Sequence, residues 1–196
     1  MSEEKIRVLR RSNSDLEFVK KLFEYYTDDF DDRFKKIEWV EGDLLDYPLL
    51  IQMLKGVDKI YHCGAIVSFR RSEKEKLIEN NIEGTANLVN ASIANNIKKI
   101  CHVSSTSAIG KPLINNFSTE DDILEPNKNT SGYSISKLES EREIWRAQEE
   151  GVKVVIVNPS VILGAGKWGA SSLSLFKNIW EGLRYYSQGS TAFVDV

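Results

Sequence analysis

A tyrosine and a lysine four residues apart, Tyr133 and Lys137, are the side chains of this sequence best suited to proton transfer. Positions i and i+4 share one face of a helix, so the lysine ammonium can stand beside the phenol. A free tyrosine titrates near pH ~10, and a neighbouring cation favours the phenolate and lowers that pKa toward neutrality. The pair is therefore a candidate for general acid–base catalysis.

A run of hydroxyl residues, Ser104 to Ser107, precedes this pair in the chain. A serine from that run would hold a substrate carbonyl or alcohol against the tyrosine while a hydride moves elsewhere. The Tyr-x-x-x-Lys spacing alone is a weak signal, because any surface helix rich in tyrosine and lysine produces it. The elements around the pair decide whether it has this role.

Strand-like and helix-like segments alternate along the whole chain, which predicts an α/β fold with a parallel sheet. The apolar strand runs are nearly continuous, as is typical of strands buried on both faces by helices. The expected strands are residues 6–9, 37–40, 57–63, 97–103, 153–157 and 193–196. The expected helices are residues 14–26, 46–55, 74–95, 133–150 and 171–183, the first opened by a capping box from Ser14 to Glu17.

Polar or small residues follow four of these strands at the point where each strand ends. They are Arg10-Arg11, Gly42-Asp43, Gly64-Ala65 and the serine run. Ligands of open parallel sheets bind beyond the carboxyl ends of the strands. This placement strengthens the hypothesis that Tyr133 faces a ligand crevice.

Composition narrows the class of protein. The chain has 196 residues, 41% of them hydrophobic and 28% charged, with a formal net charge of −3. A small acidic balance argues against nucleic acid as a partner, and no apolar run approaches the ~20 residues of a membrane span. We expect a cytoplasmic protein in which Cys63 and Cys101 are buried, reduced thiols.

Several motifs, in order, resemble those of the extended short-chain dehydrogenase/reductases, also called the NAD-dependent epimerase/dehydratase family. Tyr61–Ala65 resembles the family's HxAA signature, with Gly64 where alanine is usual. The other matching segments are Asn81–Leu88 (NxxGTxNLL), His102–Gly110 (the active-site serine strand) and Asn158–Gly166 (RPxxVYGPG, with Asn158 in place of arginine). The match covers essentially the whole chain and implies a Rossmann-like, doubly wound parallel sheet.

The resemblance implies a catalytic role for each residue of the proton-transfer group. Tyr133 would be the general acid/base, and Lys137 would lower its pKa and hydrogen-bond the nicotinamide ribose. Ser105 is the best match to the substrate-orienting serine. Ser104 and Thr106 remain competitors, because a slip of one residue in the loop would exchange them.

The resemblance also implies the cofactor site. Asn81 falls where many members keep an asparagine that supports the lysine through water. The residues expected to line the cofactor cleft, in addition to Lys137, are Asp43, Leu44, Gly64, Ala65, Pro159 and Ser160. Asp43 would approach the adenine, and Pro159 and Ser160 would lie near the nicotinamide.

Arg10 and Arg11 bear on the choice of cofactor. Where this fold selects NAD, an acidic residue after the second strand binds the ribose 2′-hydroxyl, and an arginine there accommodates a 2′-phosphate. Guanidinium groups suit a phosphate. We therefore expect NADP, with NAD as the alternative.

No segment matches the family's glycine-rich turn, where the pyrophosphate meets backbone N–H groups. The segment that begins at Ile6 matches the family's second strand. We therefore expect an interior fragment, with residues 1–163 a partial NAD(P)-binding domain lacking its first strand and helix. Residues 164–196 would begin a truncated substrate-binding region. Alone, this chain is expected to bind NADP weakly and to be inactive.

The function predicted from this resemblance is an NAD(P)-dependent oxidoreductase similar to the dihydroflavonol-reductase-like members. It would reduce a carbonyl, or oxidise an alcohol, of a small-molecule substrate. Two alternatives stay open: a nucleotide-sugar epimerase and a non-catalytic, nucleotide-sensing scaffold. The family further implies a homodimer for the full-length protein.

Overall fold

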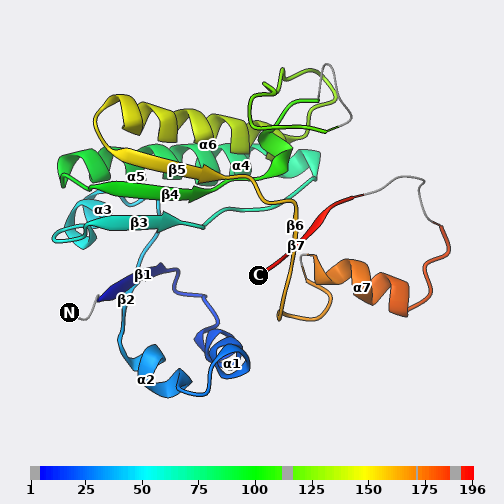
Figure 1. Ribbon diagram of the computed structural model, residues 1–196, viewed down its shortest axis with the longest axis horizontal. Coiled ribbons are helices and arrows are strands. Elements are labelled where there is room, and N and C mark those ends of the chain that lie inside the picture. Colours follow the sequence, from blue (N-terminus) through cyan, green and yellow to red (C-terminus); the bar gives the residue numbers. More distant parts are fainter. Residues whose placement is uncertain (1–4, 112–116, 171, 186–190) are drawn as a thin grey trace. The chain divides into compact units, whose positions relative to one another are not determined.

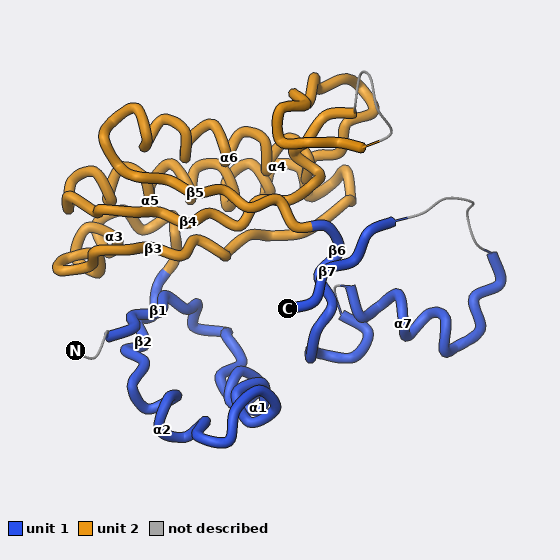
Figure 2. Tube along the Cα trace, in the orientation of Figure 1, with its two compact units in different colours: residues 1–42, 160–196 blue, residues 43–159 orange. Residues whose placement is uncertain are grey.

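The computed structural model describes residues 5–111, 117–170, 172–185 and 191–196 (Figure 1). The chain divides into two compact units (Figure 2). Unit 1 comprises residues 1–42 and 160–196, and unit 2 comprises residues 43–159. All the strand ladders of the described residues run parallel, which confirms the predicted α/β class with parallel sheets.

Unit 2 is built on a three-stranded sheet in the order β3-β4-β5, formed by Lys59–His62, Lys99–Val103 and Lys153–Val157. Helices α5 (Gly84–Ala94) and α6 (Gly132–Glu149) cover one face of this sheet (Figure 1). Helix α3 (Tyr47–Met53) packs on α5. In-register pairs align the strands, so their carboxyl ends meet at one edge of the sheet.

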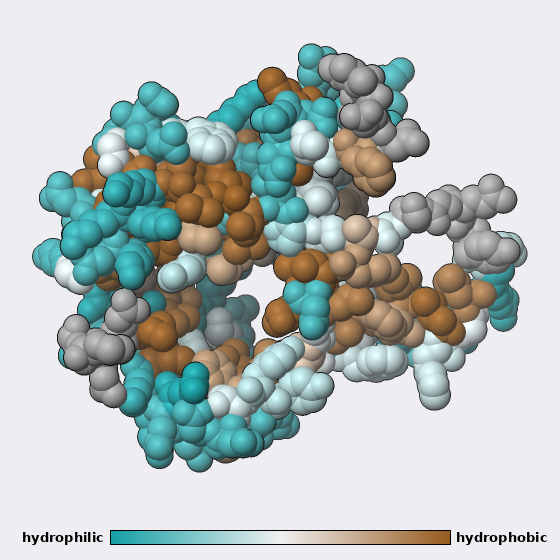
Figure 3. Space-filling model, in the orientation of Figure 1, coloured by the Kyte–Doolittle hydropathy of each residue, from teal (hydrophilic) through white to brown (hydrophobic). Residues whose placement is uncertain are grey.

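Within the described part of unit 2, helices cover one face of this sheet. Ile100 and His102 of β4 are buried on the helix side. On the other face, Tyr61 is 74% exposed and Val155 of the same register is also exposed. Figure 3 shows hydrophobic residues gathered over β4 and β5. The prediction that these strands are buried on both faces is therefore wrong for unit 2.

The same geometry corrects the prediction of two buried thiols. Cys63 is exposed and Cys101 is half-buried. Side chains alternate between the two faces of a strand, so Cys101, which follows Ile100, points to the uncovered face. The apolar character of the strands gave no sign of this asymmetry.

The helix predicted for residues 74–95 is found over residues 74–94, but its middle changes pitch. A 3-10 turn, Arg71–Glu73, leads into α4 (Lys74–Leu77), a π-helical segment (Ile78–Glu83) and then α5. Gly84 donates its N–H to the Glu79 carbonyl, a five-residue span. A Cβ on Gly84 would lie 3.0 Å from the Leu44 Cβ, so glycine allows the start of α5 to pack closely there.

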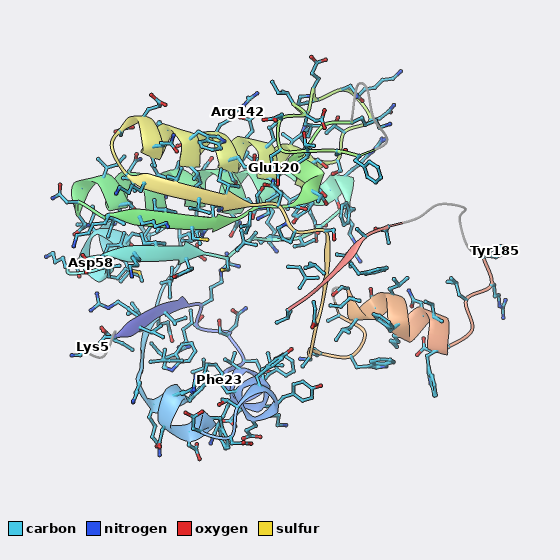
Figure 4. All side chains as sticks on the ribbon, in the orientation of Figure 1. Lys5, Phe23, Asp58, Glu120, Arg142 and Tyr185 are labelled. Carbon is cyan, nitrogen blue, oxygen red and sulfur yellow. The ribbon has the colours of Figure 1, made fainter. Side chains whose placement is uncertain are left out.

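Unit 1 holds two strand pairs, β1 (Ile6–Arg10) with β2 (Ile37–Glu41) and β6 (Val161–Leu163) with β7 (Phe193–Asp195). Its helices are α1 (Leu16–Tyr26), α2 (Phe30–Lys35) and α7 (Leu173–Trp180). The strands β1, β2 and β7 and the helices α1 and α7 were predicted; α2 and β6 were not. An aromatic cluster of Phe23 (labelled in Figure 4), Phe34 and Trp39 joins α1, α2 and β2.

The helix starts show which cap predictions hold. Asp46 caps α3 as expected, accepting from the Leu49 N–H at 3.0 Å. The cap of α1 is Asp15, which accepts from Phe18, and Ser14 instead accepts from the Arg11 N–H. The Ser14 capping box is therefore wrong by one residue.

Two predictions on the last helix and on the domain boundary are not tested by the structure. Ser171, where the last predicted helix begins, lies outside the described residues. The predicted domain boundary at residue 163 stays a prediction beside the observed division into units. Within the described ranges, no helix combines the length and apolar character needed to cross a bilayer.

Candidate active site

Tyr133 and Lys137 lie in the first two turns of α6 and are both buried, at 8% and 4% exposure. The helix begins where Ser131 accepts a hydrogen bond from the Ser134 N–H at 3.0 Å. The Tyr133 ring packs edge-on against Phe69, with centroids 5.5 Å apart. The predicted helix therefore holds the phenol and the ammonium on one face.

Lys137 links α6 to the carboxyl end of β4. Its Nζ donates a hydrogen bond to the Val103 carbonyl at 2.9 Å. Burial lowers the pKa of this ammonium, while the Glu141 carboxylate acts in the opposite direction and raises it. A buried amine thus has both a hydrogen-bond acceptor and a nearby negative charge.

Ser105 is the member of the serine run whose side chain acts on the Tyr133 phenol, lowering its pKa. It lies just after β4 in an extended conformation, and its Oγ also accepts from the Ser107 N–H at 3.1 Å. Ser104 is buried and its Oγ has no hydrogen-bond partner among the described residues. Thr106 is exposed. This geometry favours Ser105 over both competitors.

The structure corrects the predicted electrostatics of Tyr133. Burial raises the pKa of its phenol, and the hydrogen bond from Ser105 lowers it by less. A raised pKa favours the neutral form of this phenol.

Asn81, in the π-helical segment, binds the backbone of Ile66. Its Oδ1 accepts from the Ile66 N–H at 2.8 Å, and its Nδ2 donates to the Ile66 carbonyl at 2.9 Å. Nδ2 also donates to Ser136 Oγ at 3.0 Å. The side chain that the resemblance placed beneath the lysine thus fixes the segment after Gly64 and Ala65 against α6.

Two buried serines of α6, missed in the sequence, complete this contact. Ser136 Oγ donates to the Tyr133 carbonyl at 2.9 Å, and Ser140 Oγ lies 2.8 Å from the Asn81 carbonyl. Both serines are essentially unexposed. Their spacing of four residues on the inward face of a helix was the available signal.

A second group missed in the sequence lies beside Ser105. Asn158, which follows β5, donates from Nδ2 to the Glu141 Oε1 at 2.6 Å and to the Ser105 carbonyl at 3.2 Å. The Thr106 N–H also donates to the Pro159 carbonyl at 3.1 Å. The loops after β4 and β5 are therefore joined. Glu141 continues the four-residue spacing of Tyr133 and Lys137, which could have revealed it.

The predicted cofactor residues of unit 2 fall into two kinds. Gly64 and Ala65 are exposed at the carboxyl end of β3, and a Cβ on Gly64 would meet only Leu44, at 3.9 Å. Asp43 and Leu44 have structural contacts. The Asp43 carboxylate accepts from the Leu45 N–H at 3.1 Å, and the Leu44 carbonyl accepts from the Asn87 side chain.

The remaining predicted cofactor residues are at or beyond the unit boundary. Pro159 ends unit 2, and Ser160, Arg10 and Arg11 belong to unit 1. Arg10 is ion-paired with Glu41 at 2.9 Å, so a 2′-phosphate would compete with that carboxylate. In the described ranges, no cluster of three or more His, Cys, Asp or Glu residues is arranged to hold a metal.

Comparison with known proteins identifies the family of this chain. Residues 5–183 match the model of the NAD dependent epimerase/dehydratase family. The chain belongs to this family. Its curated relatives include reductases and dehydrogenases, so its homologues are enzymes.

Two relatives give the range of similarity. Cinnamoyl-CoA reductase 1 of Petunia hybrida is 28% identical over 172 residues, covering 83% of this chain and 51% of the relative. The sterol demethylase protein B of Methylococcus capsulatus is 32% identical over 130 residues, covering 65% of this chain and 39% of the relative. The aligned part thus spans about half or less of these relatives' length.

Solved structures support the fold of the family. The dTDP-glucose 4,6-dehydratase DesIV of Streptomyces venezuelae, solved as a double mutant with NAD bound, matches with a TM-score of 0.70 and 27% identity. That match covers 82% of this chain and 51% of DesIV. A UDP-N-acetylglucosamine 4-epimerase of Methanobrevibacter ruminantium, at 21% identity, shares the fold with a TM-score of 0.75 over 97% of this chain and 61% of its own.

Proposed function

We propose that this family member is an NAD(P)-dependent oxidoreductase that reduces a substrate carbonyl, or oxidises the corresponding alcohol, with Tyr133 as the acid/base. The observation that carries the proposal is the interaction of the Ser105 side chain with the phenol of Tyr133, four residues before the buried Lys137 on the same helix. Two hydroxyl groups that meet at the carboxyl edge of a parallel sheet can bind one oxygen atom of a substrate.

The raised pKa of Tyr133 suits the reductive direction. A neutral phenol donates a proton to the oxygen that gains negative charge as the carbonyl is reduced. Ser105 orients that oxygen by a hydrogen bond. Lys137 places a positive charge near the phenolate that remains, which lowers the cost of giving up the proton.

The residues at this edge fit a nicotinamide nucleotide. Gly64 and Ala65 present exposed backbone, and the Lys137 ammonium supplies a donor for a ribose hydroxyl. When bound, the nicotinamide supplies or accepts the hydride. The notable sequence similarity to cinnamoyl-CoA reductase and to a putative dihydroflavonol 4-reductase of Synechocystis supports a reductase over an epimerase. NADP is the proposed cofactor because guanidinium groups such as those of Arg10 and Arg11 suit a 2′-phosphate, which would have to displace Glu41 from Arg10.

The test uses the product of the complete gene, because the aligned chain spans only part of its relatives. NADPH and NADH oxidation is followed with a panel of aromatic and aliphatic aldehydes, ketones and acyl-CoA thioesters. We expect net NADPH oxidation with at least one carbonyl class. The matched variant Tyr133→Phe should lose turnover by at least ~100-fold and retain cofactor binding, measured by nicotinamide fluorescence.

Three other outcomes of this experiment would change the proposed function. Interconversion of nucleotide sugars without net oxidation of NADPH would identify an epimerase. Unchanged turnover in Tyr133→Phe would remove Tyr133 from the mechanism. Nucleotide binding without turnover of any substrate class would favour the nucleotide-sensing scaffold.

A further inference from the structure

Glu141 and Asn158 connect separate parts of the candidate site. Glu141 lies one helical turn beyond Lys137, and Asn158 lies directly after β5. Nδ2 of Asn158 carries two hydrogens, which its bonds to Glu141 and to the Ser105 carbonyl use. The Asn158 amide therefore connects α6, the helix that bears Tyr133, to Ser105.

The two hydrogen bonds of this bridge differ in strength. The bond to Glu141, at 2.6 Å, is short and has an ionised acceptor, whereas the bond to Ser105, at 3.2 Å, has a neutral one. A charge-assisted bond is the stronger kind. The bond to Glu141 fixes the Asn158 side chain on α6. The Ser105 carbonyl therefore accepts its hydrogen bond from an amide whose position is already fixed.

The carboxylate has a second role toward Lys137. Burial disfavours the ammonium form of this lysine, and Glu141 is the leading influence that opposes burial. An arginine at position 158 would place a full positive charge beside Glu141. The neutral Asn158 leaves the negative charge of Glu141 to act on Lys137.

We propose that Glu141 and Asn158 are positioning residues of this active site, forming a carboxylate–amide bridge that fixes Ser105 against the helix of Tyr133. The proposal rests on the oxidoreductase function proposed above. Neither side chain acts on the substrate itself. Their effect is exerted through Ser105 and Lys137.

The first test is a mutant cycle on the complete protein with its carbonyl substrate. Asn158→Ala is expected to lower kcat by ~10- to 100-fold, the scale of a small misplacement of a reacting group, with the KM for the nicotinamide cofactor changed less than about twofold. Ser105→Ala combined with Asn158→Ala should be no slower than Ser105→Ala alone, because the bridge acts through Ser105. Additive losses would overturn the proposal.

Two further variants separate the charge of Glu141 from its shape. Glu141→Gln keeps an oxygen for Asn158 and removes the charge, so it should lower kcat less than Glu141→Ala. The control is Glu139→Gln, a loss of the same charge on the same helix, where Glu139 is paired only with the exposed Arg142 among the described contacts. Glu139→Gln should leave kcat unchanged. Equal losses in Glu139→Gln and Glu141→Gln would refute a specific role for Glu141.

A measurement that needs no turnover separates this inference from the proposed function. Hydrogen exchange of the peptide covering residues 104–110 should be faster in Asn158→Ala than in the parent protein, and unchanged in Glu139→Gln. This measurement can be made even if no carbonyl substrate is found. An unchanged exchange rate in Asn158→Ala would overturn the bridge, whatever the reaction is.

Discussion

Asn81 pairs with the backbone of Ile66 through both ends of its side-chain amide, at 2.8 and 2.9 Å. This arrangement repeats the two hydrogen bonds that adjacent strands exchange. It holds the segment after β3 to a helical segment fifteen residues further along the chain. The Asn81 side chain is 3% exposed, so a partner that it loses is not readily replaced by water.

Asn81→Asp is expected to destabilise the protein by about 2–4 kcal/mol, because a buried carboxylate would face the Ile66 carbonyl and lose the donor for Ser136. Urea denaturation at pH 7 measures this change. The matched control is Asn90→Asp on α5, where the amide oxygen accepts from Arg146 on an exposed surface. We expect a change below about 0.5 kcal/mol there. Similar effects at both sites would contradict the special role of Asn81.

The only two histidines of the chain, His62 and His102, stack inside unit 2 with ring centroids 4.9 Å apart. Burial lowers the pKa of His62 to about 4 and that of His102 to about 3. Each folded pKa lies below the unfolded value, so the unfolded state binds more protons at acidic pH. Stability is therefore complete above pH ~6.5 and is lost as the pH falls toward the folded values.

We expect this loss to reach about 3 kcal/mol for each ring, or about 6 kcal/mol together, between pH 7 and pH 4. The double variant His62→Leu/His102→Leu removes both titrating rings and should flatten the curve of unfolding free energy against pH in this range. The carboxylates that both proteins share contribute equally to the two curves, so the difference between the slopes reports the histidines alone. Parallel curves would show that the buried rings do not control acid stability.

Gly110 and Gly64 offer a matched pair of glycine substitutions. A Cβ on Gly110 would lie 2.4 Å from the Ile123 carbonyl oxygen, so Gly110→Ala is expected to destabilise by about 1–3 kcal/mol. Gly64→Ala would meet only Leu44, at 3.9 Å, and should leave the melting temperature within about 2 °C of the parent value. Equal shifts in both variants would contradict the close approach at Gly110.

Lys137→Met tests the role of the buried ammonium. We expect turnover of the carbonyl substrate to fall by at least ~100-fold, because the charge near the phenolate is gone. Stability should change by less than about 2 kcal/mol, since an apolar side chain of similar length avoids the cost of burying a charge. Steady-state kinetics and urea denaturation measure the two effects. Turnover retained in a folded Lys137→Met protein would contradict the assignment.

Much of the fold was predictable because it depends on local patterns. The alternation of apolar strands with helices, and the i,i+4 spacing of Tyr133 and Lys137, lie within short stretches of sequence. The bridge from Asn158 to Glu141 could not be found this way, since it joins residues brought together only by the packing of α6 beside β5. The raised pKa of Tyr133 was missed because burial is the largest influence on it, and burial follows from the tertiary structure.

Helix α2 and the open sheet face show two other limits. The segment Phe30–Lys35 has only six residues, two of them aromatic, and its helix is stabilised by the ring of Phe34 against Phe23 and Trp39. The strands β3 to β5 have the apolar composition of strands buried on both faces, but their burial depends on which helices pack against them.

Asp58, labelled in Figure 4, lies just before β3 and is paired with Lys98, at the sheet end opposite the site.

The π-helical turn at residues 78–83 makes this part of the chain intolerant of changes in length. Removing one residue there would restore ordinary α-helical winding and leave α4 and α5 facing nearly as before, but the side chains within the turn would lose their present directions. Asn81 would then no longer face both Ile66 and Ser136. Natural variants of this gene should accept many substitutions in this turn but almost no single-codon deletions.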